Sequence, residues 1–257
     1  MKKLPLVLII LSVIFVYVEA QTKSVSKVKK TVAKPTKTAT PKPVVALKTP
    51  TPAPTPIPTP IQVLPPAQTI SLSKFEAEIF AELNAFRVNP QGYAKHLEDF
   101  LQTFDGKYFR NSAGVMLDSF EGKIPVVEAI ATLKQAQPMS EFNLADGLIK
   151  AAADHSQDLV KNNRTGHRGT NGSMPNERVF IYGTVPNNEV YENISYGGKT
   201  AREVVLIMLI DDGTASRNHR KSLLNPKNKY VGLATGENKA GGAHCILVIA
   251  PGFADKK

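Results

Sequence analysis

Cysteine is nearly absent from this sequence: Cys245 is the single cysteine among 257 residues, and there is no tryptophan. A lone cysteine excludes an internal disulfide, so the fold must be stabilised by an apolar core. Cys245 lies in the apolar run 243–250 and is expected to be a buried small hydrophobic residue, with an intermolecular disulfide as the alternative. The sequence also has no internal repeat, glycine-rich phosphate loop or zinc-protease helix motif, so none of these patterns indicates a function.

Acidic residues are absent from residues 21–70, which contain eight lysines, eleven prolines and many threonines. Such a segment buries too little apolar area to offset its conformational entropy, so we predict a disordered linker that is partly polyproline II. At about 3.1 Å per residue, the extended linker would reach roughly 150 Å. Its lysines make it either a solvated spacer or a segment that contacts an anionic envelope.

The net charge of +10 is concentrated in that linker. From residue 71 onward the sequence has 22 basic and 21 acidic residues, so this part is nearly neutral. The balance argues against nucleic acid as a partner, because a nucleic-acid-binding domain carries a concentrated basic surface.

Residues 1–20 begin with two lysines after Met1, continue with an apolar run and end in Val-Glu-Ala. This layout predicts a secretory signal peptide that is cleaved after Ala20. The alternative is an uncleaved membrane anchor, although the apolar run is shorter than the roughly 20 residues of a spanning helix. Residues 71–257 remain for one globular domain, in a protein that we expect to be secreted or associated with the cell envelope.

Hydrophobic periodicity and capping residues predict helices first and short strands later. Ser73 and Glu76 have the capping-box spacing ahead of a helix that ends at Asn89-Pro90, and Thr200 can cap a helix from Ala201 to about Ile210. This order indicates an α+β domain rather than a parallel α/β fold. The other expected elements are a helix over 91–101, a long loop or small hairpin over 103–123, a helix beginning near Pro125, a helix over 144–161 capped by Asn143, a strand over 178–182, and strands over 229–234 and 243–250.

Two histidines and a glutamate lie in short polar motifs. His167 is flanked by glycines in a loop, Glu192 is expected in another polar loop, and His219 lies in the polar stretch 216–221, shortly after two aspartates. Imidazole nitrogen and carboxylate oxygen are usual ligands of zinc, so these residues are candidates for a divalent-metal site. The ligands are scattered, and their spacing alone does not show that they converge.

His155 and Ser156 are neighbours in the predicted helix 144–161. His155 falls on the apolar face, where a packed and hydrogen-bonded core histidine is expected more often than a ligand. Adjacent helix positions point apart, so Ser156 is not expected to act with His155 as a nucleophile.

Several short blocks resemble, in order, the signature blocks of the CAP superfamily, which contains the cysteine-rich secretory proteins, antigen 5 and the plant pathogenesis-related 1 proteins, and whose domain is also called SCP-like. The resemblance covers about residues 75–253 and fits the cysteine-poor branch of bacteria and protists, because the disulfides of animal and plant members are absent. The blocks are AAADHSQDL at 151–159, GHRG at 166–169, ENI at 192–194, DDG at 211–213 with RNHR at 217–220, YVGLA at 230–234, and an opening helix with LNAFRVNP at 83–90.

The resemblance implies a three-layer α-β-α sandwich with a small, mostly antiparallel sheet and a cleft holding two histidines and two acidic residues. Carried over by position, these are His167, Glu192, Asp211 and His219. Better-known members have a glutamate where Asp211 stands, and Asp212 is a competing candidate.

The resemblance also implies a secreted binding module whose partner is a lipid or sterol, another small ligand, or an extracellular protein. Its cleft would hold Zn²⁺ or another divalent metal. Catalysis does not define the family. The alternative is a metal-dependent extracellular hydrolase of peptide or envelope polymer, in which Glu192 serves as the base. A third interpretation assigns the function to the lysine-rich linker and makes the domain a passenger.

Overall fold

The computed structural model describes residues 71–256, so the predicted signal peptide and the Pro-rich linker lie outside the described residues. Helices and short strands are interspersed along these residues, and the longest strands come near the end. The helices are α1 (Lys74–Val88), α2 (Pro90–Leu101), α3 (Ile124–Gln135), α4 (Asp146–Lys161), α5 (Pro175–Tyr182), the 3₁₀ helix η1 (Pro186–Asn188), α6 (Ala201–Ile210) and α7 (Asn218–Leu223). The strands are β1 (Phe104–Asp105), β2 (Tyr108–Arg110), β3 (Met116–Asp118), β4 (Asn143–Leu144), β5 (Gly183–Thr184), β6 (Tyr191–Tyr196), β7 (Tyr230–Asn238), β8 (Gly242–Ala250) and β9 (Ala254–Asp255).

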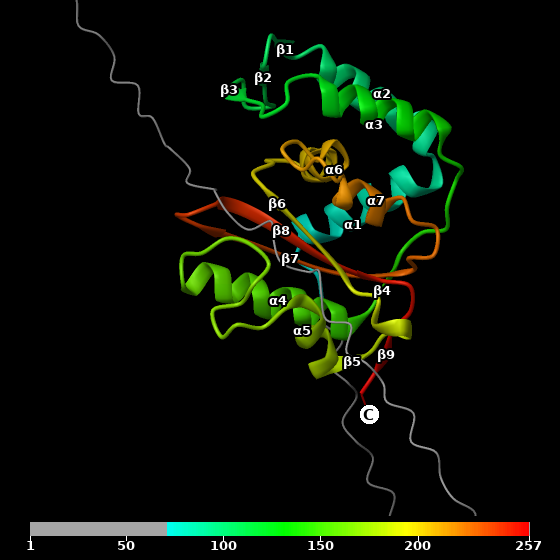
Figure 1. Cartoon of the computed structure of the whole chain (residues 1–257), viewed down its shortest axis with the longest axis vertical. Helices are drawn as coiled ribbons and strands as arrows, with labels where there is room; N and C mark the ends of the chain where they lie inside the picture. Colours follow the sequence, from blue (N-terminus) through cyan, green and yellow to red (C-terminus); the bar gives the residue numbers. More distant parts are fainter. Residues whose placement is uncertain (1–70, 257) are drawn as a thin grey trace, which may run out of the picture. The chain divides into compact units, whose positions relative to one another are not determined.

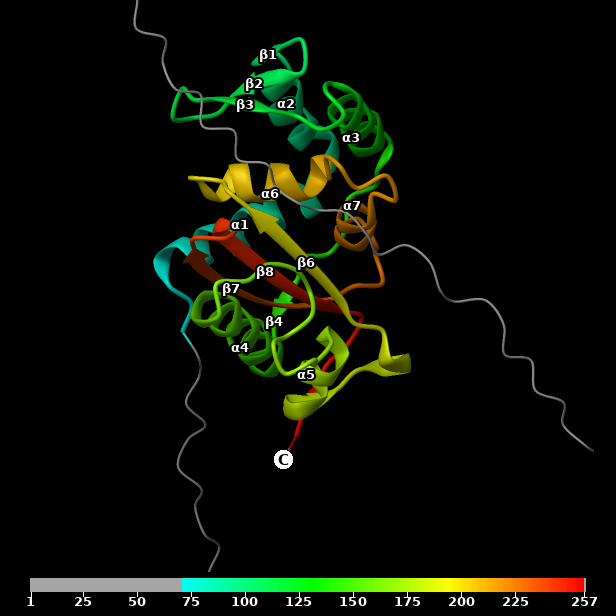
Figure 2. The same cartoon turned by 60° about the vertical axis from the view of Figure 1, so that its left-hand side comes forward.

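The main sheet has the strand order β4-β7-β8-β6. β4 runs parallel to β7, whereas β7 pairs with β8 and β8 with β6 in antiparallel fashion. Helices α4 and α5 cover one face of this sheet, and α1, α6 and α7 lie over the other (Figure 1). Helices α2 and α3 and the small sheet β1-β2-β3 lie beyond α6 (Figure 2). The predicted three-layer α-β-α sandwich with a mostly antiparallel sheet is confirmed.

Side chains that alternate along β8 fill two apolar cores. Cys245, Leu247 and Ile249 belong to the core under α1 and α6, while Ile246 and Val248 belong to the core under α4. Such alternation is expected of a central strand that is buried on both faces. The prediction that Cys245 is a buried small residue is therefore confirmed.

Helix α4 lies directly on β7 at Gly232. A Cβ at this glycine would collide with the backbone of Leu148 and of Ile149 in α4. The position therefore accepts only glycine unless the helix shifts. The close contact fixes α4, and with it His155, against the sheet.

Several predicted helix boundaries are confirmed. The Ser73 hydroxyl accepts a hydrogen bond from Glu76 N and the Glu76 carboxylate accepts one from Ser73 N, as a capping box requires. The Asn89 side chain accepts from Gly92 N at the start of α2, and Thr200 accepts from Glu203 N at the start of α6.

Three local predictions were wrong. Residues 178–182 form part of α5 rather than a strand, because Pro175 occupies the first turn and the Glu177 carboxylate caps Met174 N. Asn143 does not cap a helix: it lies in β4, and α4 begins at Asp146. Glu192 lies in strand β6 rather than in a loop.

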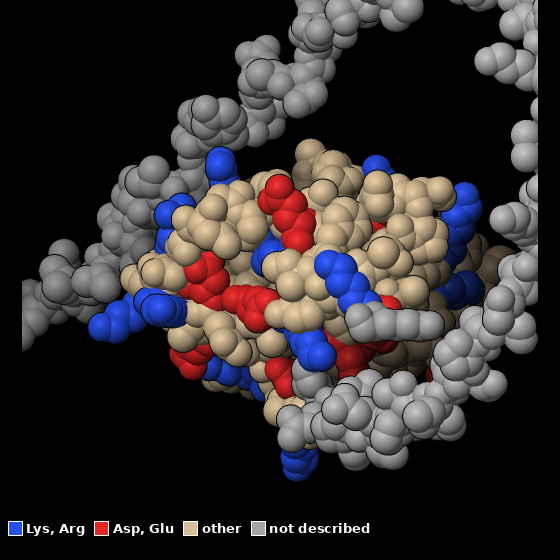
Figure 3. All heavy atoms as spheres, turned by 90° about the horizontal axis from the view of Figure 1, so that it is seen from below, with Lys and Arg blue, Asp and Glu red and all other residues tan. Residues whose placement is uncertain are grey.

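Charges of both signs are interspersed on the face shown in Figure 3, with Lys and Arg beside Asp and Glu. This distribution agrees with the 22 basic and 21 acidic residues found from residue 71 onward. Within residues 71–256, no helix combines the length and apolar character needed to cross a bilayer.

Candidate functional site

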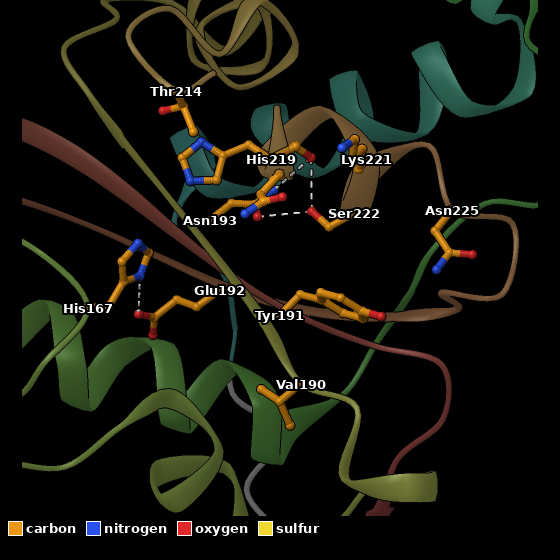
Figure 4. A pocket seen from close by; sticks show the side chains of 11 residues that line it. His167, Val190, Tyr191, Glu192, Asn193, Thr214, His219, Lys221, Ser222 and Asn225 are labelled. Carbon is orange, nitrogen blue, oxygen red and sulfur yellow. Dashed lines mark hydrogen bonds and ion pairs between the residues drawn. The ribbon is translucent and has the colours of Figure 1, made fainter. Parts of the chain in front are cut away.

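A cavity of about 640 Å³ opens beside β6, one of the two edge strands of the main sheet. Its walls come from the loop after α4, from β6 and from α7 with its flanking loops, so both helical layers contribute (Figure 4). Most of its side chains are polar. The lining residues are His167, Val190, Tyr191, Glu192, Asn193, Thr214, Asn218, His219, Lys221, Ser222 and Asn225.

Glu192 and His167 form the first acid–histidine pair of this cleft. His167 Nδ1 lies 2.9 Å from Glu192 Oε1, and Arg178 Nη2 donates to Glu192 Oε2 at 2.7 Å. Arg178 Nη2 also donates to the His167 carbonyl oxygen at 3.0 Å. The Glu192 side chain is only 1% exposed, whereas that of His167 is 47% exposed. A fixed, buried carboxylate therefore orients an accessible imidazole.

His155 lies near Glu192 and is fully buried, so the prediction of a core histidine is confirmed. Its Nε2 is 2.8 Å from the Gly166 carbonyl oxygen and 3.8 Å from Glu192 Oε1. Burial is the largest influence on the pKa of His155 and lowers it, although the Glu192 charge acts in the opposite direction. The buried ring holds the carbonyl oxygen of Gly166, next to His167.

Asp211 and His219 form the second acid–histidine pair. His219 Nδ1 lies 3.0 Å from Asp211 Oδ1, and His219 N donates to Asp211 Oδ2 at 2.8 Å. Burial favours the neutral Asp211 carboxyl, but the hydrogen bonds from His219 and from the Arg220 backbone outweigh it and lower the pKa of Asp211. Asp211 ends α6 with a φ of 58°, a conformation that aspartate tolerates better than most residues.

Asp212, the competing candidate, does not face His219. Its carboxylate accepts from Ser119 Oγ and from the backbone N–H groups of Phe120 and Glu121, at 2.8 to 3.0 Å. The two adjacent aspartates therefore have different roles: Asp211 orients His219, and Asp212 connects the end of α6 to the loop before α3 through hydrogen bonds.

The two imidazoles come close to each other. The ring centroids of His167 and His219 lie 6.5 Å apart, with an angle of 57° between the ring planes. Each Nδ1 faces its own carboxylate, which favours the tautomer protonated at Nδ1 and leaves the Nε2 lone pair available. Neither Nε2 has a hydrogen-bond partner among residues 71–256. The arrangement presents two imidazoles, with their Nε2 atoms unpaired, to one cavity.

This geometry fits a divalent metal only in part. Histidine ligands of zinc usually donate their other N–H to a carboxylate, as the Nδ1 atoms of His167 and His219 do here. Within residues 71–256, however, no group of three or more His, Cys, Asp or Glu side chains is arranged to bind a metal ion. The structure thus brings the four predicted residues together as two oriented imidazoles and two supporting carboxylates, rather than as four converging ligands.

Two residues that support the site, Arg178 and Arg217, were missed by the sequence analysis. Arg178 was assigned to a strand, and that assignment predicted no contact between its guanidinium and Glu192. Arg217 donates to both oxygens of Glu121, at 2.6 and 2.7 Å, and to the Asp211 carbonyl oxygen at 3.0 Å. His244 lies 3.0 Å from Ser156 Oγ, so Ser156 points toward β8 and away from His155. The sequence offered one signal for these residues: the helical spacing after Pro175 could have placed Arg178 in a helix.

Comparison with known proteins identifies the class. The family model described as "CAP: Cysteine-rich secretory protein family" matches residues 80–249, which is more than half of the chain. The chain therefore belongs to the CAP family.

The individual proteins that the chain matches share less than 30% of its residues over the aligned part. The chain is 29% identical over 127 residues to "Uncharacterized protein YkwD" of Bacillus subtilis, covering 49% of this chain and 46% of that protein. The chain thus matches about half the length of this curated relative. Among solved structures, an outer surface protein from Borrelia burgdorferi aligns with a TM-score of 0.37 and 18% identity, over 59% of this chain and all of that one. An extracellular SCP-domain protein of Bacillus anthracis aligns with a TM-score of 0.34 and 17% identity, over 50% and 39% of the two chains.

Proposed function

We propose that this CAP protein is an extracellular binding module whose cleft presents His167 and His219 to a ligand or to a divalent metal such as Zn²⁺. The main support for this proposal is that each imidazole is oriented through Nδ1 by its own buried carboxylate, so both Nε2 atoms are available at one cavity. The predicted signal peptide and the family assignment support an extracellular location.

The donor set supports a metal held by two imidazoles, with Glu192 and Asp211 as orienting groups. A bound zinc ion would supply a Lewis acid and open coordination positions for a ligand from solution or from a partner. His167 and His219 would bind the metal, and the two carboxylates would hold the rings in place. Asp211 is shorter than glutamate by one methylene, and in this role it needs to reach only His219.

Binding is better supported than hydrolysis. A general base must reach the proton that it accepts, within about 2.6–3.2 Å or through one water. The Glu192 carboxylate is buried, with Oε1 at His167 and Oε2 at Arg178. Releasing it for catalysis would leave the Arg178 guanidinium, which is 6% exposed, without its counter-charge. These contacts favour a supporting role for Glu192 over a catalytic one.

The lining of the cavity favours a polar partner, such as an extracellular protein, over a sterol or another lipid. Pockets for apolar ligands are lined mainly by hydrophobic and aromatic side chains. Here Val190 and Tyr191 are the apolar contributors, and the remaining lining residues are polar or charged.

Calorimetric titration of the full chain with zinc tests the metal part of this proposal. We expect one zinc per chain and a loss of binding of at least tenfold in the His167→Ala/His219→Ala double variant, because each histidine supplies one donor. His96→Ala is the matched control, since His96 packs on Tyr93 in α2, away from the cleft. Zinc binding that survives the double variant, or that is lost in the control, would contradict the assignment.

A further inference from the structure

The free edge of β6 presents unpaired backbone groups. Hydrogen-bonded pairs alternate along an antiparallel ladder. Gly197 N donates to the Ala243 carbonyl oxygen at 2.7 Å, and the register continues from there through Ser195↔Cys245 and Asn193↔Leu247. Ser195 and Asn193 therefore bond to β8, while the N–H and C=O groups of Glu192 and Ile194 point to the open side of the sheet.

These outward groups have no hydrogen-bond partner among residues 71–256. At Glu192 they are also accessible: the residue as a whole is partly exposed although its side chain is 1% exposed, so the accessible area belongs to the backbone. Ile194 is only 6% exposed and does not line the cavity, so Glu192 is the accessible point of this edge. Glu192 lines the cavity together with Val190, Tyr191 and Asn193, and β6 runs along it between His167 and His219 (Figure 4). One wall of the cleft is thus a strand edge.

A strand edge selects an extended backbone as its ligand. Unpaired, alternating N–H and C=O groups are satisfied by another strand at about 4.8 Å, and edges that are left open in native proteins serve as docking sites for peptides. Lipids and sterols cannot supply this alternation of donors and acceptors.

The charge of the cleft selects an acidic side chain on that peptide. Glu192 and Asp211 are buried and already hydrogen-bonded to His167 and His219, so neither presents free negative charge to the cavity. Lys221 lines the cavity, is exposed and has no ion-pair partner among the described residues. A carboxylate on the peptide would pair with this ammonium group, whereas the Nε2 lone pairs of His167 and His219 would accept a hydrogen bond from a donor on the peptide.

We propose that the β6 edge docks an extended, acidic segment of a partner protein, which adds to the main sheet beside β6 and directs a carboxylate toward Lys221. The inference deepens the proposed function, since it rests on the cleft being a binding site and names the chemical class of the partner. Specificity would come from the side-chain contacts, and affinity from the main-chain bonds.

A random octapeptide library, selected on the immobilised full chain, supplies the probe. We expect enriched peptides that carry Asp or Glu and whose binding is sensitive to backbone N-methylation at alternate positions. In an added strand, every second peptide N–H faces β6. Methylation of an N–H that faces β6 should weaken binding about tenfold per lost hydrogen bond, whereas methylation of the N–H groups between them should have little effect. No enriched peptide, or enriched peptides without this alternation, would overturn the proposal.

Charge reversal tests the acidic preference in the same assay. Lys221→Glu should weaken the enriched peptides about fivefold to tenfold, while Lys239→Glu, in the exposed turn between β7 and β8, should not. Equal effects of the two variants would overturn the assignment of Lys221. Zinc titration of the same protein separates the two hypotheses: zinc binding without peptide binding rejects the strand-docking proposal alone, and peptide binding without zinc binding rejects the metal assignment alone.

Discussion

The two acid–histidine pairs of the cleft are built in opposite ways. The Glu192–His167 pair is assembled from distant segments: Glu192 comes from β6, His167 from the loop after α4, and Arg178 from α5. The Asp211–His219 pair lies within nine residues of chain at the end of α6. The first pair therefore depends on tertiary packing, whereas the second depends mainly on local backbone geometry.

The pairs also differ in what holds the carboxylate. Glu192 faces a buried cation, Arg178, which in turn ties down the His167 carbonyl oxygen. Asp211 accepts backbone N–H groups instead, and its loop is anchored from outside through Arg217 and Glu121. Damage to one pair is accordingly expected to leave the other intact, and three substitutions test this independence.

Arg178→Met should have the largest effect. Removing one partner of a buried ion pair leaves Glu192 charged without compensation, which typically costs about 3–5 kcal/mol. The free energy of unfolding, measured by guanidinium denaturation, should fall by about this amount. Arg202→Met is the matched control, because the Arg202–Glu82 pair has a half-exposed arginine and should cost no more than about 1 kcal/mol. Equal losses would show that the Arg178–Glu192 pair is not the main support of the site.

Tyr196→Phe should have a smaller effect on the same pair. The Tyr196 hydroxyl accepts a hydrogen bond from Gly166 N at 2.7 Å, next to His167. Its loss should lower the free energy of unfolding by about 0.5–1.5 kcal/mol and shift the NMR signals of His167 but not those of His219. Tyr230→Phe controls for the lost hydroxyl, since Tyr230 has no side-chain hydrogen bond among residues 71–256. A shift of both histidines would contradict the independence of the pairs.

Glu121→Gln should have the smallest effect, confined to the Asp211–His219 pair. The pKa of Glu121 is lowered to about 2, mainly by the hydrogen bonds from Arg217. Because the folded-state pKa lies below the unfolded-state value, this stabilisation is present above about pH 4.5 and is lost as the pH falls toward 2. The pair is partly exposed, so we expect a loss of about 1 kcal/mol or less at pH 7.

The pH dependence of unfolding checks this substitution. The difference in free energy of unfolding between wild type and Glu121→Gln should be constant above about pH 5 and should shrink toward zero near pH 2. Glu98→Gln, which removes an exposed pair with Lys134, should leave the His219 NMR signals unchanged. A difference that instead grew on acidification would contradict the role of Arg217.

The sequence predicted what is encoded locally. The Ser73 capping box, the Thr200 cap and the burial of His155 follow from spacing within one helix, and all three are present. Strand β6 was missed because two of its three buried residues are polar: Asn193 and Ser195 are buried on either side of Ile194, and Asn193 Oδ1 accepts from Ser222 Oγ at 2.9 Å. A strand whose buried polar groups bond to distant residues looks like a loop in the sequence.

The convergence of the site was not predictable from residue spacing. Nothing in the sequence around Arg178 indicates that its guanidinium reaches Glu192, because the contact depends on α5 packing beside β6. The choice between Asp211 and Asp212 required the left-handed backbone at Asp211, which directs the two carboxylates to different partners. Family resemblance supplied the four residues, and the structure assigns them as two pairs.

The burial of Cys245 makes this protein its own reporter of unfolding. The thiol lies in the middle of β8, 1% exposed, and burial raises its pKa, so neither access nor ionisation favours reaction while the sheet is closed. Reaction with a thiol reagent would require β8 to separate from the layers above and below it. Since the chain has one cysteine, each modified molecule records one such opening, and the labelling rate measures how often the centre of the sandwich comes apart.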